Sequence, residues 1–354
     1  MSKVVITGSS GLVGSAAAFY FAEKGFDVVG IDNDSRKMFF GDEASTKSTG
    51  LALAAKLSNF SLIDADIRDF ERMEKLFSNQ REGISAVIHC AAQPSHDWAA
   101  KDPITDFEVN AVGTLNLLEV TRRYSPSAPF IFMSTNKVYG DRPNLIDYLE
   151  KDSRWTPPEA SRWVGGFDES LSIDDSTHSI FGVSKTSADL LVQEYGRYFG
   201  LKTAVFRGGC LTGPDHAGVA LHGFLSYLVK CVVHGNSYTI FGHKGKQVRD
   251  NIHTSDLVEA FWRFFQEPTE GAVFNIGGGN TANVSMMEAI ELTQQLAKRE
   301  LSYQVSDLAR KGDHIWYVSD TSKLETKYPG WKVTVGIQEI LEEMVEREQL
   351  SKKH

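Results

Sequence analysis

KVVITGSSGLVGSAAAFYFAEKGFDVVGID, residues 3–32, is the stretch that decides the fold. Residues 4–6 form a continuous apolar run, which is typical of a strand buried on both faces of a sheet. The run leads into Gly8, Gly11 and Gly14, in the spacing G-x-x-G-x-x-G. The two earlier glycines let the backbone turn sharply and approach a pyrophosphate, while Gly14 lets the next helix pack closely on the sheet. The stretch therefore predicts a strand, a phosphate-binding turn and a helix.

The predicted helix covers residues 12–24 and ends at Gly25. Its positive N-terminal end points at the anion held by the turn. We therefore expect Ser10, Leu12 and Val13 to contact the phosphates of a dinucleotide cofactor.

A second apolar run, residues 28–31, ends at Asp32. A carboxylate at this place accepts hydrogen bonds from both hydroxyls of an adenosine ribose, which favours NAD. Arg36 and Lys37 follow closely and could instead pair with a 2'-phosphate, so NADP stays open as an alternative.

The composition excludes several function classes. The chain has 354 residues and a formal net charge of −9, from 37 basic and 46 acidic residues, and it has no long basic run, which argues against nucleic acid as a partner. Cys90, Cys210 and Cys231 are far apart and odd in number, as expected in a reducing compartment without a structural zinc site. We expect a cytoplasmic protein with no secretion signal, no membrane span and no bound metal.

Strands alternate with helices along most of the chain. Further strands are predicted at residues 61–65, 86–90, 130–133, 203–207 and 272–276, and further helices at residues 69–78, 102–124, 184–199 and 256–266. This α/β alternation predicts a Rossmann-type, doubly wound parallel sheet. Between residues 34 and 60 we expect a loop with one short helix.

Ligands of such sheets bind beyond the carboxyl ends of the strands, where Gly8, Asp32, Asp66, Ala91 and Thr135 all fall. Asp66 would lie beside the adenine, although an acid here could equally be the N-cap of the following helix. The other cofactor contacts that we expect on this edge are Asn33, Ile67, Ala92 and Gln93.

Two further regions depart from the alternation. Residues 141–178 are rich in proline and glycine and lack clear periodicity, which indicates a lid or a partner-contact insertion, with disorder as the alternative. From Cys210 onward the alternation loosens. We therefore predict an NAD-binding domain of residues 1–209 plus about 248–278, and a smaller substrate-binding lobe of residues 210–247 plus 279–354.

Five longer strings carry a resemblance to a known family: STNKVYGD at 134–141, GFDES at 166–170, SIFGVSK at 179–185, GKQVRD at 245–250 and VFNIGG at 273–278. With the glycine turn, they make the chain resemble the extended short-chain dehydrogenase/reductase family of nucleotide-sugar-modifying enzymes over nearly its whole length. Within that family, the strings are similar to those of the CDP-tyvelose 2-epimerases, also called CDP-paratose 2-epimerases.

The resemblance implies a hydride mechanism with bound NAD. A tyrosine and a lysine, four residues apart on one helix, act together: the lysine lowers the pKa of the phenol, which removes a proton from a sugar hydroxyl. Carried onto this sequence, Lys185 is the lysine and Thr135 is the hydroxyl that bonds the reacting oxygen. Asn110 matches the asparagine that supports the lysine.

Phe181 occupies the position of the tyrosine, and a phenyl ring has no ionisable proton. Three interpretations follow. Phe181 is a replacement made to trap a complex; or it is natural, and His96, Tyr139 or a water takes the proton; or the protein binds without turnover. Loss of a positioned acid or base costs roughly 10²–10⁴ in rate, so slow turnover is compatible with Phe181.

The resemblance also implies a CDP- or UDP-linked sugar, with Gln93, His96, Asn136 and Arg249 as contacts. Arg249 matches an arginine that clamps the nucleotide diphosphate. Its alternative role is a surface ion pair with Asp250. Ile315 stands at the position of the family's second clamping arginine, and His314, Arg310 or Lys311 could take over the role of that arginine.

Family members commonly pair through two helices beside the sheet, here residues 104–124 and 184–199, which implies a homodimer or a tetramer. Two rival functions remain. A 4-epimerase or dehydratase is one, although Asn136 and Lys137 lack the carboxylate that a dehydratase needs. A non-catalytic dinucleotide-binding sensor is the other, and Phe181 is its best argument.

Overall fold

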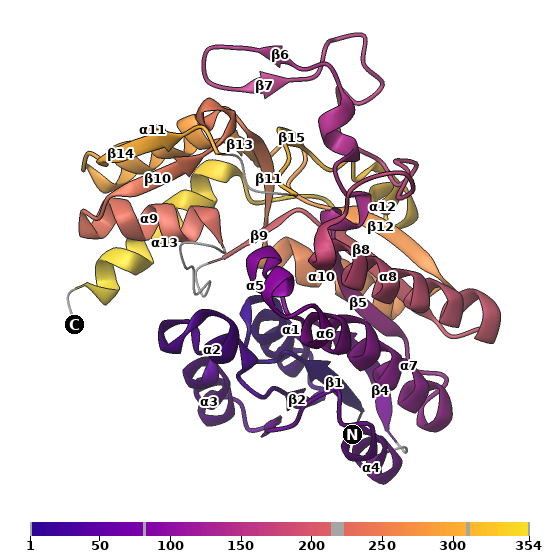
Figure 1. The fold of residues 1–354 in the computed structure, drawn as a ribbon. Helices are drawn as coiled ribbons and strands as arrows, with labels where there is room; N and C mark the ends of the chain where they lie inside the picture. Colours follow the sequence, from indigo (N-terminus) through magenta and orange to yellow (C-terminus); the bar gives the residue numbers. More distant parts are fainter. Residues whose placement is uncertain (1, 81–82, 214–222, 309–311, 353–354) are drawn as a thin grey trace. The chain divides into compact units, whose positions relative to one another are not determined.

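The computed structural model describes residues 2–80, 83–213, 223–308 and 312–352 (Figure 1). Its central feature within these residues is a 7-stranded sheet in the order β12-β8-β5-β4-β1-β2-β3. The strands are β1 (Lys3–Thr7), β2 (Asp27–Ile31), β3 (Phe60–Ile63), β4 (Ile84–His89), β5 (Phe130–Thr135), β8 (Thr203–Gly208) and β12 (Ala272–Ile276). β1 pairs in parallel with both β2 and β4, so the strand order reverses beside β1. The predicted doubly wound sheet is confirmed, and this reversal is where such sheets bind ligands.

Helices connect the strands and flank the sheet (Figure 1). They are α1 (Leu12–Glu23), α2 (Ser35–Phe40), α3 (Lys47–Lys56), α4 (Phe70–Gln80), α5 (His96–Lys101), α6 (Pro103–Phe107), α7 (Gly113–Tyr124), α8 (Ser179–Phe199) and α10 (Thr254–Gln266). Short 3₁₀ turns lie at Asp42–Ala44, Asn136–Tyr139, Arg142–Leu145 and His243–Gly245. None of the helices in the described part of the chain is long and apolar enough to cross a membrane.

Two of the differences between the structure and the predicted elements lie in unlike parts of the chain. Residues 34–60 hold two α-helices, α2 and α3, instead of one short helix in a loop. The single helix predicted over residues 102–124 is interrupted by a π-helical turn at Glu108–Val112. Such turns are rare and occur mostly as single turns inside α-helices, so nothing in the sequence indicates one here.

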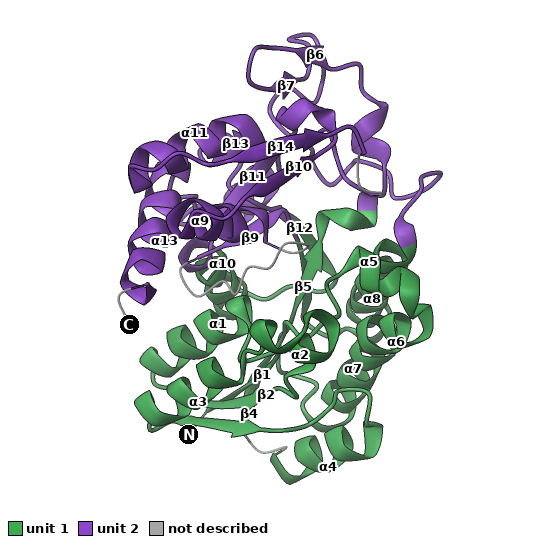
Figure 2. Cartoon of the chain, turned by 60° about the vertical axis from the view of Figure 1, so that its left-hand side comes forward, with its two compact units in different colours: residues 1–138, 180–207, 257–274 green, residues 139–179, 208–256, 275–354 purple. Residues whose placement is uncertain are grey.

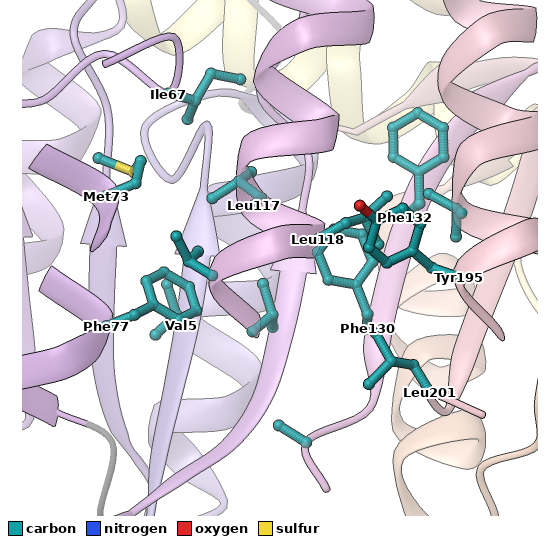
Figure 3. Close-up of a cluster of buried hydrophobic side chains, with 14 of the residues drawn as sticks. Val5, Ile67, Met73, Phe77, Leu117, Leu118, Phe130, Phe132, Tyr195 and Leu201 are labelled. Atoms are coloured by element: carbon teal, nitrogen blue, oxygen red, sulfur yellow. The ribbon is translucent and has the colours of Figure 1, made fainter. Parts of the chain in front are cut away.

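A continuous apolar core lies between the sheet and the helices α4, α7 and α8. Figure 3 shows this cluster, which includes Phe77, Leu117 and Phe130, all of them fully buried. Each such side chain stabilises the fold by about 1.5–3 kcal/mol relative to an exposed one. Two aromatic residues of α10, Phe261 and Phe264, are also fully buried.

The chain divides into two compact units (Figure 2). Unit 1 contains residues 1–138, 180–207 and 257–274, and unit 2 contains residues 139–179, 208–256 and 275–354. The segments 139–179 and 248–256 therefore fall in unit 2, whereas we predicted from the sequence that they belong to the NAD-binding domain. The division of cofactor and substrate binding between two domains stays a prediction.

Unit 2 has its own sheets and its own apolar core. Its strands are β6 (Leu149–Glu150), β7 (Trp155–Thr156), β9 (Cys210–Thr212), β10 (Tyr238–Phe241), β11 (Val248–His253), β13 (Asn283–Ser285), β14 (Tyr303–Ser306) and β15 (Trp316–Tyr317). Its helices are α9 (Phe224–His234), α11 (Met286–Ala297), α12 (Ser322–Lys327) and α13 (Ile337–Ser351). β11 is central, because it pairs with β9, β13 and β15.

The segment 141–178 is anchored within unit 2 at several points. The antiparallel pair β6–β7 is held by Glu150, which forms ion pairs with Lys244 and Lys246 at 2.9 Å each. Arg154 donates to Glu288 from Nε at 2.7 Å. Whether this anchored segment acts as a lid or as a partner contact stays a prediction.

Candidate active site

In the turn between β1 and α1, Gly8 and Gly14 are required for two different reasons. Gly8 has a positive φ of 67°, and a Cβ on Gly14 would lie 2.0 Å from the Gly8 carbonyl oxygen, so both positions require glycine for the turn and for helix packing. Gly11 has neither constraint, because a Cβ there would meet the Gly8 carbonyl oxygen at an ordinary 3.4 Å. The protein itself therefore leaves space over Gly11, on the side where a ligand can approach the backbone.

The N-terminus of α1 is suited to an anion. Its N-cap is Gly11, which supplies no side-chain hydrogen bond, and the first turn has no acidic residue. The first-turn N–H groups, including those of Leu12 and Val13, point along the helix axis with their partial positive charge uncompensated by a cap. Together with the open space over Gly11, this arrangement fits the pyrophosphate of a dinucleotide.

Asp32, directly after β2, is fixed by the turn itself. Its Oδ2 accepts from the Ser10 N–H at 2.9 Å, and its Oδ1 accepts from the Asp34 N–H at 2.8 Å. Burial raises the pKa of the carboxyl, and these two backbone N–H groups oppose the rise. Each carboxylate oxygen retains a further lone pair, so the group can still accept hydrogen bonds from a ribose.

The next strand end contributes Asp66, which lies beside Asn33. The Asn33 amide donates to Asp66 Oδ2 at 3.2 Å, and Arg68 forms an ion pair with the same carboxylate at 2.8 Å. Burial alone would raise the pKa of Asp66, but the hydrogen bonds from Arg68 outweigh it and lower the pKa. Ile67 instead points into the core shown in Figure 3, so its role as a cofactor contact stays a prediction.

After β4 the chain passes through Ala91 and Ala92 to Gln93, whose side chain is committed to the protein. Its Nε2 donates to the Ser95 carbonyl oxygen at 2.9 Å and to Asp106 Oδ1 at 2.6 Å. Its Oε1 accepts from the Ser95 N–H. Gln93 therefore fixes the backbone that leads into α5, and a direct contact with cofactor or substrate stays a prediction.

Asn110 lies in the π-helical turn and joins two parts of unit 1. Its Oδ1 accepts from the Gln93 N–H at 2.9 Å. Its Nδ2 lies 3.0 Å from the Ser184 hydroxyl oxygen on α8 and 3.1 Å from Asp106 Oδ1. Burial raises the pKa of the fully buried Asp106, against the hydrogen bonds from Ser184 and Gln93 that lower it. Asn110 thus couples the segment after β4 to the helix that carries Lys185.

Lys185 is 3% exposed and reaches the end of β5. Its ammonium donates to the Met133 carbonyl oxygen at 3.0 Å and lies 4.3 Å from the centroid of the Phe132 ring. Burial lowers the pKa of Lys185 to about 8, although the charges of Asp189, Cys90 and Asp106 each oppose this. An ammonium has three donors, and Met133 is the one hydrogen-bond acceptor that the described residues show for it. The remaining donors fit the hydroxyls of a bound ribose.

Thr135 ends β5 with a partly exposed side chain. Its hydroxyl accepts from the Lys137 N–H at 3.2 Å and lies 3.4 Å from Asn136 Oδ1. The preceding Ser134 has a different role, because its hydroxyl donates to the buried Asp189 at 2.8 Å. Asp189 in turn forms a buried ion pair with Arg207 at 2.9 Å.

Phe181 lies one helical turn before Lys185 on α8 and is 6% exposed. Its ring packs edge-to-face against the imidazole of His96, with 4.8 Å between the ring centroids and an interplanar angle of 63°. His96 is the first residue of α5 and is partly exposed. The structure therefore brings together Asn110, Lys185 and Phe181, as the sequence predicts, with His96 beside them.

In unit 2, Arg249 is mostly buried on β11. It forms an ion pair with Asp313, and its Nη1 donates to the Val248 carbonyl oxygen at 2.8 Å. The alternative of a surface ion pair with Asp250 is wrong, because successive side chains of a strand point to opposite faces. Asp250 is instead buried, accepts from the Ser319 N–H at 2.9 Å, and has a pKa raised by burial to about 6.

The residues proposed to replace the second clamping arginine are not all placed. His314 is fully buried, and its Nε2 lies 2.8 Å from the Gly140 carbonyl oxygen. The Ile315 N–H donates to Asn144 Oδ1 at 2.8 Å. Arg310 and Lys311 lie outside the described residues.

Sequence reasoning missed three polar residues of these clusters: Asp106, Ser184 and Asp313. Asp106 precedes Asn110 by four residues, which places both on one helix face, so an acid at that spacing was a readable signal. Ser184 directly precedes Lys185. Asp313 pairs with Arg249 from a position 64 residues away, and no local sequence pattern predicts this contact. Within the described residues, no group of three or more His, Cys, Asp or Glu side chains is arranged to hold a metal ion.

Comparison with known proteins gives concordant results. The family described as "NAD dependent epimerase/dehydratase family" matches residues 4–277. A CDP-paratose 2-epimerase from Salmonella typhi is 30% identical over 97% of this chain and 98% of its own length. A dTDP-glucose 4,6-dehydratase from Shigella flexneri is 29% identical over 93% of this chain and 88% of its own. The structure of a Thermus thermophilus UDP-glucose 4-epimerase, a complex with NAD, superimposes with a TM-score of 0.78 at 25% identity and covers 98% of both chains.

Proposed function

The chain belongs to the NAD dependent epimerase/dehydratase family, and from this premise we propose that it is a nucleotide-sugar epimerase of the CDP-tyvelose 2-epimerase type. It acts by transient oxidation of a sugar carbinol. NAD is the cofactor, as in the family and in the similar solved structure. The open backbone at Gly11, the uncapped start of α1 and the acceptors of Asp32 are the features that would hold it.

The observation that carries this proposal is the environment of Lys185. A buried ammonium lowers the stability of the fold by several kcal/mol unless a partner compensates its charge. Here it is kept at the carboxyl edge of the sheet, with one backbone acceptor and a network through Ser184 and Asn110 behind its helix. A sensor would need Lys185 for ribose binding alone, whereas an epimerase also needs its charge beside the reacting hydroxyl.

Each residue then has a defined task. NAD, when bound, accepts a hydride from the sugar carbon and returns it. Lys185 binds the nicotinamide ribose and stabilises negative charge near the reacting hydroxyl. Thr135 donates a hydrogen bond to the sugar oxygen and orients it, because its hydroxyl is partly exposed and its long 3.4 Å hydrogen bond to Asn136 Oδ1 can be exchanged for one to the sugar. Asn110 is a positioning residue that fixes α8.

Arg249 is the proposed contact for the nucleotide diphosphate, because a guanidinium fork matches phosphate oxygens. Its pairing with Asp313 holds the guanidinium in place before substrate binds, and this contact then competes with the phosphate. The similar Salmonella protein favours a CDP-linked sugar, and the Thermus protein favours a UDP-linked one as the alternative.

We also propose a homodimer, with a tetramer as the alternative, formed through α6–α7 and α8. These helices expose apolar side chains, which include Ile104 (72% exposed), Phe107, Val183 and Leu190. Exposed apolar side chains gathered on neighbouring helices are typical of an oligomer contact.

Two rival functions are tested by the same experiment. A 4-epimerase or a dehydratase is one, and Asn136–Lys137 argues against the dehydratase because neither residue is a carboxylic acid. A non-catalytic sensor is the other, favoured by Phe181. Lys185, Thr135 and Asn110 argue against the sensor, since their arrangement serves a nicotinamide site.

The experiment is incubation of the protein and of Phe181→Tyr with CDP- and UDP-linked hexoses in deuterated water, followed by NMR of the sugar protons. A C2 epimer without deuterium at the inverted carbon supports the proposal, because the hydride removed is the hydride returned, whereas inversion at C4 indicates the 4-epimerase. A 4-keto-6-deoxy product that contains solvent deuterium indicates a dehydratase. NAD binding without a sugar product in either protein indicates the sensor and contradicts the proposal.

A further inference from the structure

The phenyl ring of Phe181 cannot accept or donate a proton, but the imidazole of His96, which packs against it, can. Phe181 occupies the site of an acid/base group without having one, and an imidazole packs against its ring at 4.8 Å. We propose that His96 is the catalytic acid/base of this protein, accepting the proton of the sugar hydroxyl and returning it. This inference rests on the proposed epimerase function and deepens it.

His96 is held in place by the network that also supports Lys185. The Ser95 hydroxyl accepts from the Trp98 N–H at 3.2 Å and so caps α5. Ser95 is fixed by Gln93, and the Gln93 N–H donates to Asn110 at 2.9 Å. Because Asn110 also contacts Ser184 on α8, one set of hydrogen bonds positions both His96 and the helix of Lys185.

The other candidate side chain is less suited to the task. Tyr139 is fully buried, and its hydroxyl donates to Asn275 Oδ1 at 2.7 Å within unit 2. A phenol whose proton is already committed to a buried amide is a poor proton acceptor. His96 is partly exposed, so its imidazole can reach a substrate and exchange its proton with water.

The proposed step balances. The sugar O–H proton passes to an imidazole nitrogen of His96, the C–H bond breaks, a hydride with two electrons passes to NAD, and a carbonyl forms at the sugar carbon. In the return step the hydride adds to the other face of the carbonyl, and the imidazolium gives its proton back to the oxygen. No water and no further oxidant is consumed.

The pH dependence of this step follows from its two ionisable groups. A histidine acts as a base only in its neutral form, so protonation of His96 at acid pH stops the step. Lys185 interacts electrostatically with Asp189, Cys90 and Asp106, and its ammonium is lost above its pKa of about 8. We therefore expect turnover to fall at acid pH and again above about pH 8.

The test compares His96→Gln with Asp97→Asn, a matched change at the next, exposed residue of the same helix. His96→Gln should lower kcat by roughly 10²–10⁴-fold and remove the acidic limb of the pH profile, with unchanged NAD affinity and thermal midpoint. Asp97→Asn should stay within a few-fold of the unchanged protein. Adding Phe181→Tyr to His96→Gln should restore turnover, because the phenol then takes over the proton.

A second readout does not depend on turnover. In protein with ¹⁵N-labelled histidine and bound NAD, addition of a CDP- or UDP-linked sugar should shift the imidazole signals of His96, assigned with His96→Gln. Unshifted signals, or full activity with an intact acidic limb in His96→Gln, would overturn the role of His96 while leaving an active epimerase. Absence of any sugar product in both the unchanged protein and Phe181→Tyr overturns the epimerase function, and the role of His96 with it.

Discussion

The glycine turn follows β1, and the Lys185 cluster, which consists of Lys185, Ser184, Asn110 and Asp106, lies near the end of β5 in the same sheet. The turn consists of backbone groups, whereas the cluster consists of side chains. The turn is built from backbone: Gly8, Gly14 and the first N–H groups of α1. The cluster is built from side chains on α6, the π-helical turn and α8, joined by buried hydrogen bonds. A site made of backbone groups changes little when neighbouring side chains change. A site made of side chains can have one position without an ionisable group, such as Phe181, while Lys185 and Asn110 remain.

The largest expected effect is at the side-chain site. Lys185→Met removes a charge whose pKa burial lowers from its usual 10.5 to about 8. Turnover should fall by about 10²–10⁴-fold, measured as epimer formed with time, because the charge stabilises the transition state. The free energy of unfolding at pH 7 should rise by up to about 3 kcal/mol in urea denaturation, since an unfavourable buried charge is removed.

The pH dependence of stability separates this account from simple loss of packing. Between about pH 8 and 10.5 the unfolded chain keeps a proton on Lys185 that the folded protein has lost, so stability should rise with pH in that range. Lys185→Met should remove this rise. A variant that is less stable than the unchanged protein at pH 7 would show that the buried ammonium has a favourable partner.

The next largest effect separates the role of Gly14 in packing from the role of Gly11 in binding NAD. Gly14→Ala places a Cβ against the Gly8 backbone and should lower the free energy of unfolding by about 1–3 kcal/mol. Gly11→Ala adds a Cβ where the protein leaves room, so thermal stability should stay unchanged while the Kd for NAD rises at least about tenfold. Calorimetry and NAD titration measure both. Equal NAD affinity in Gly11→Ala would mean that no pyrophosphate lies over this position.

The smallest effect compares two neighbours at the end of β5. Thr135→Val removes a partly exposed hydroxyl and should lower kcat about tenfold with little change in stability. Ser134→Ala removes a buried donor to Asp189 and should instead cost about 1–2 kcal/mol of stability, with kcat nearly unchanged. If both variants lose activity in proportion to stability, Thr135 has no special role.

The backbone site was predictable because local spacing encodes it. The strand, the glycines and Asp32 lie within 30 consecutive residues, and the structure confirms the fold that they imply. The side-chain site was predictable only in part. Lys185, Asn110 and Phe181 came from resemblance, and the structure brings them together. The Asp106–Asn110 contact is indicated by the spacing of four residues, whereas the Ser184 contact depends on packing between helices that sequence does not show.

The alternative pairing of Arg249 with Asp250 fails for a clear physical reason. Adjacent residues on a strand point to opposite faces, so an acid next to an arginine in sequence is the partner least available to it. The actual partner, Asp313, comes from a distant segment. The contact of His96 with Phe181 likewise joins residues 96 and 181, and only the tertiary structure selects it among the proton acceptors that the sequence leaves open.

The central claim is that a nicotinamide ring binds beside Lys185 and Thr135. It is tested most directly by NMR of protein with labelled threonine methyl groups and bound NAD, with the Thr135 methyl assigned by its loss in Thr135→Val. The account predicts nuclear Overhauser effects between the nicotinamide ring protons and the Thr135 methyl. Bound NAD whose nicotinamide protons show no such effect would contradict it.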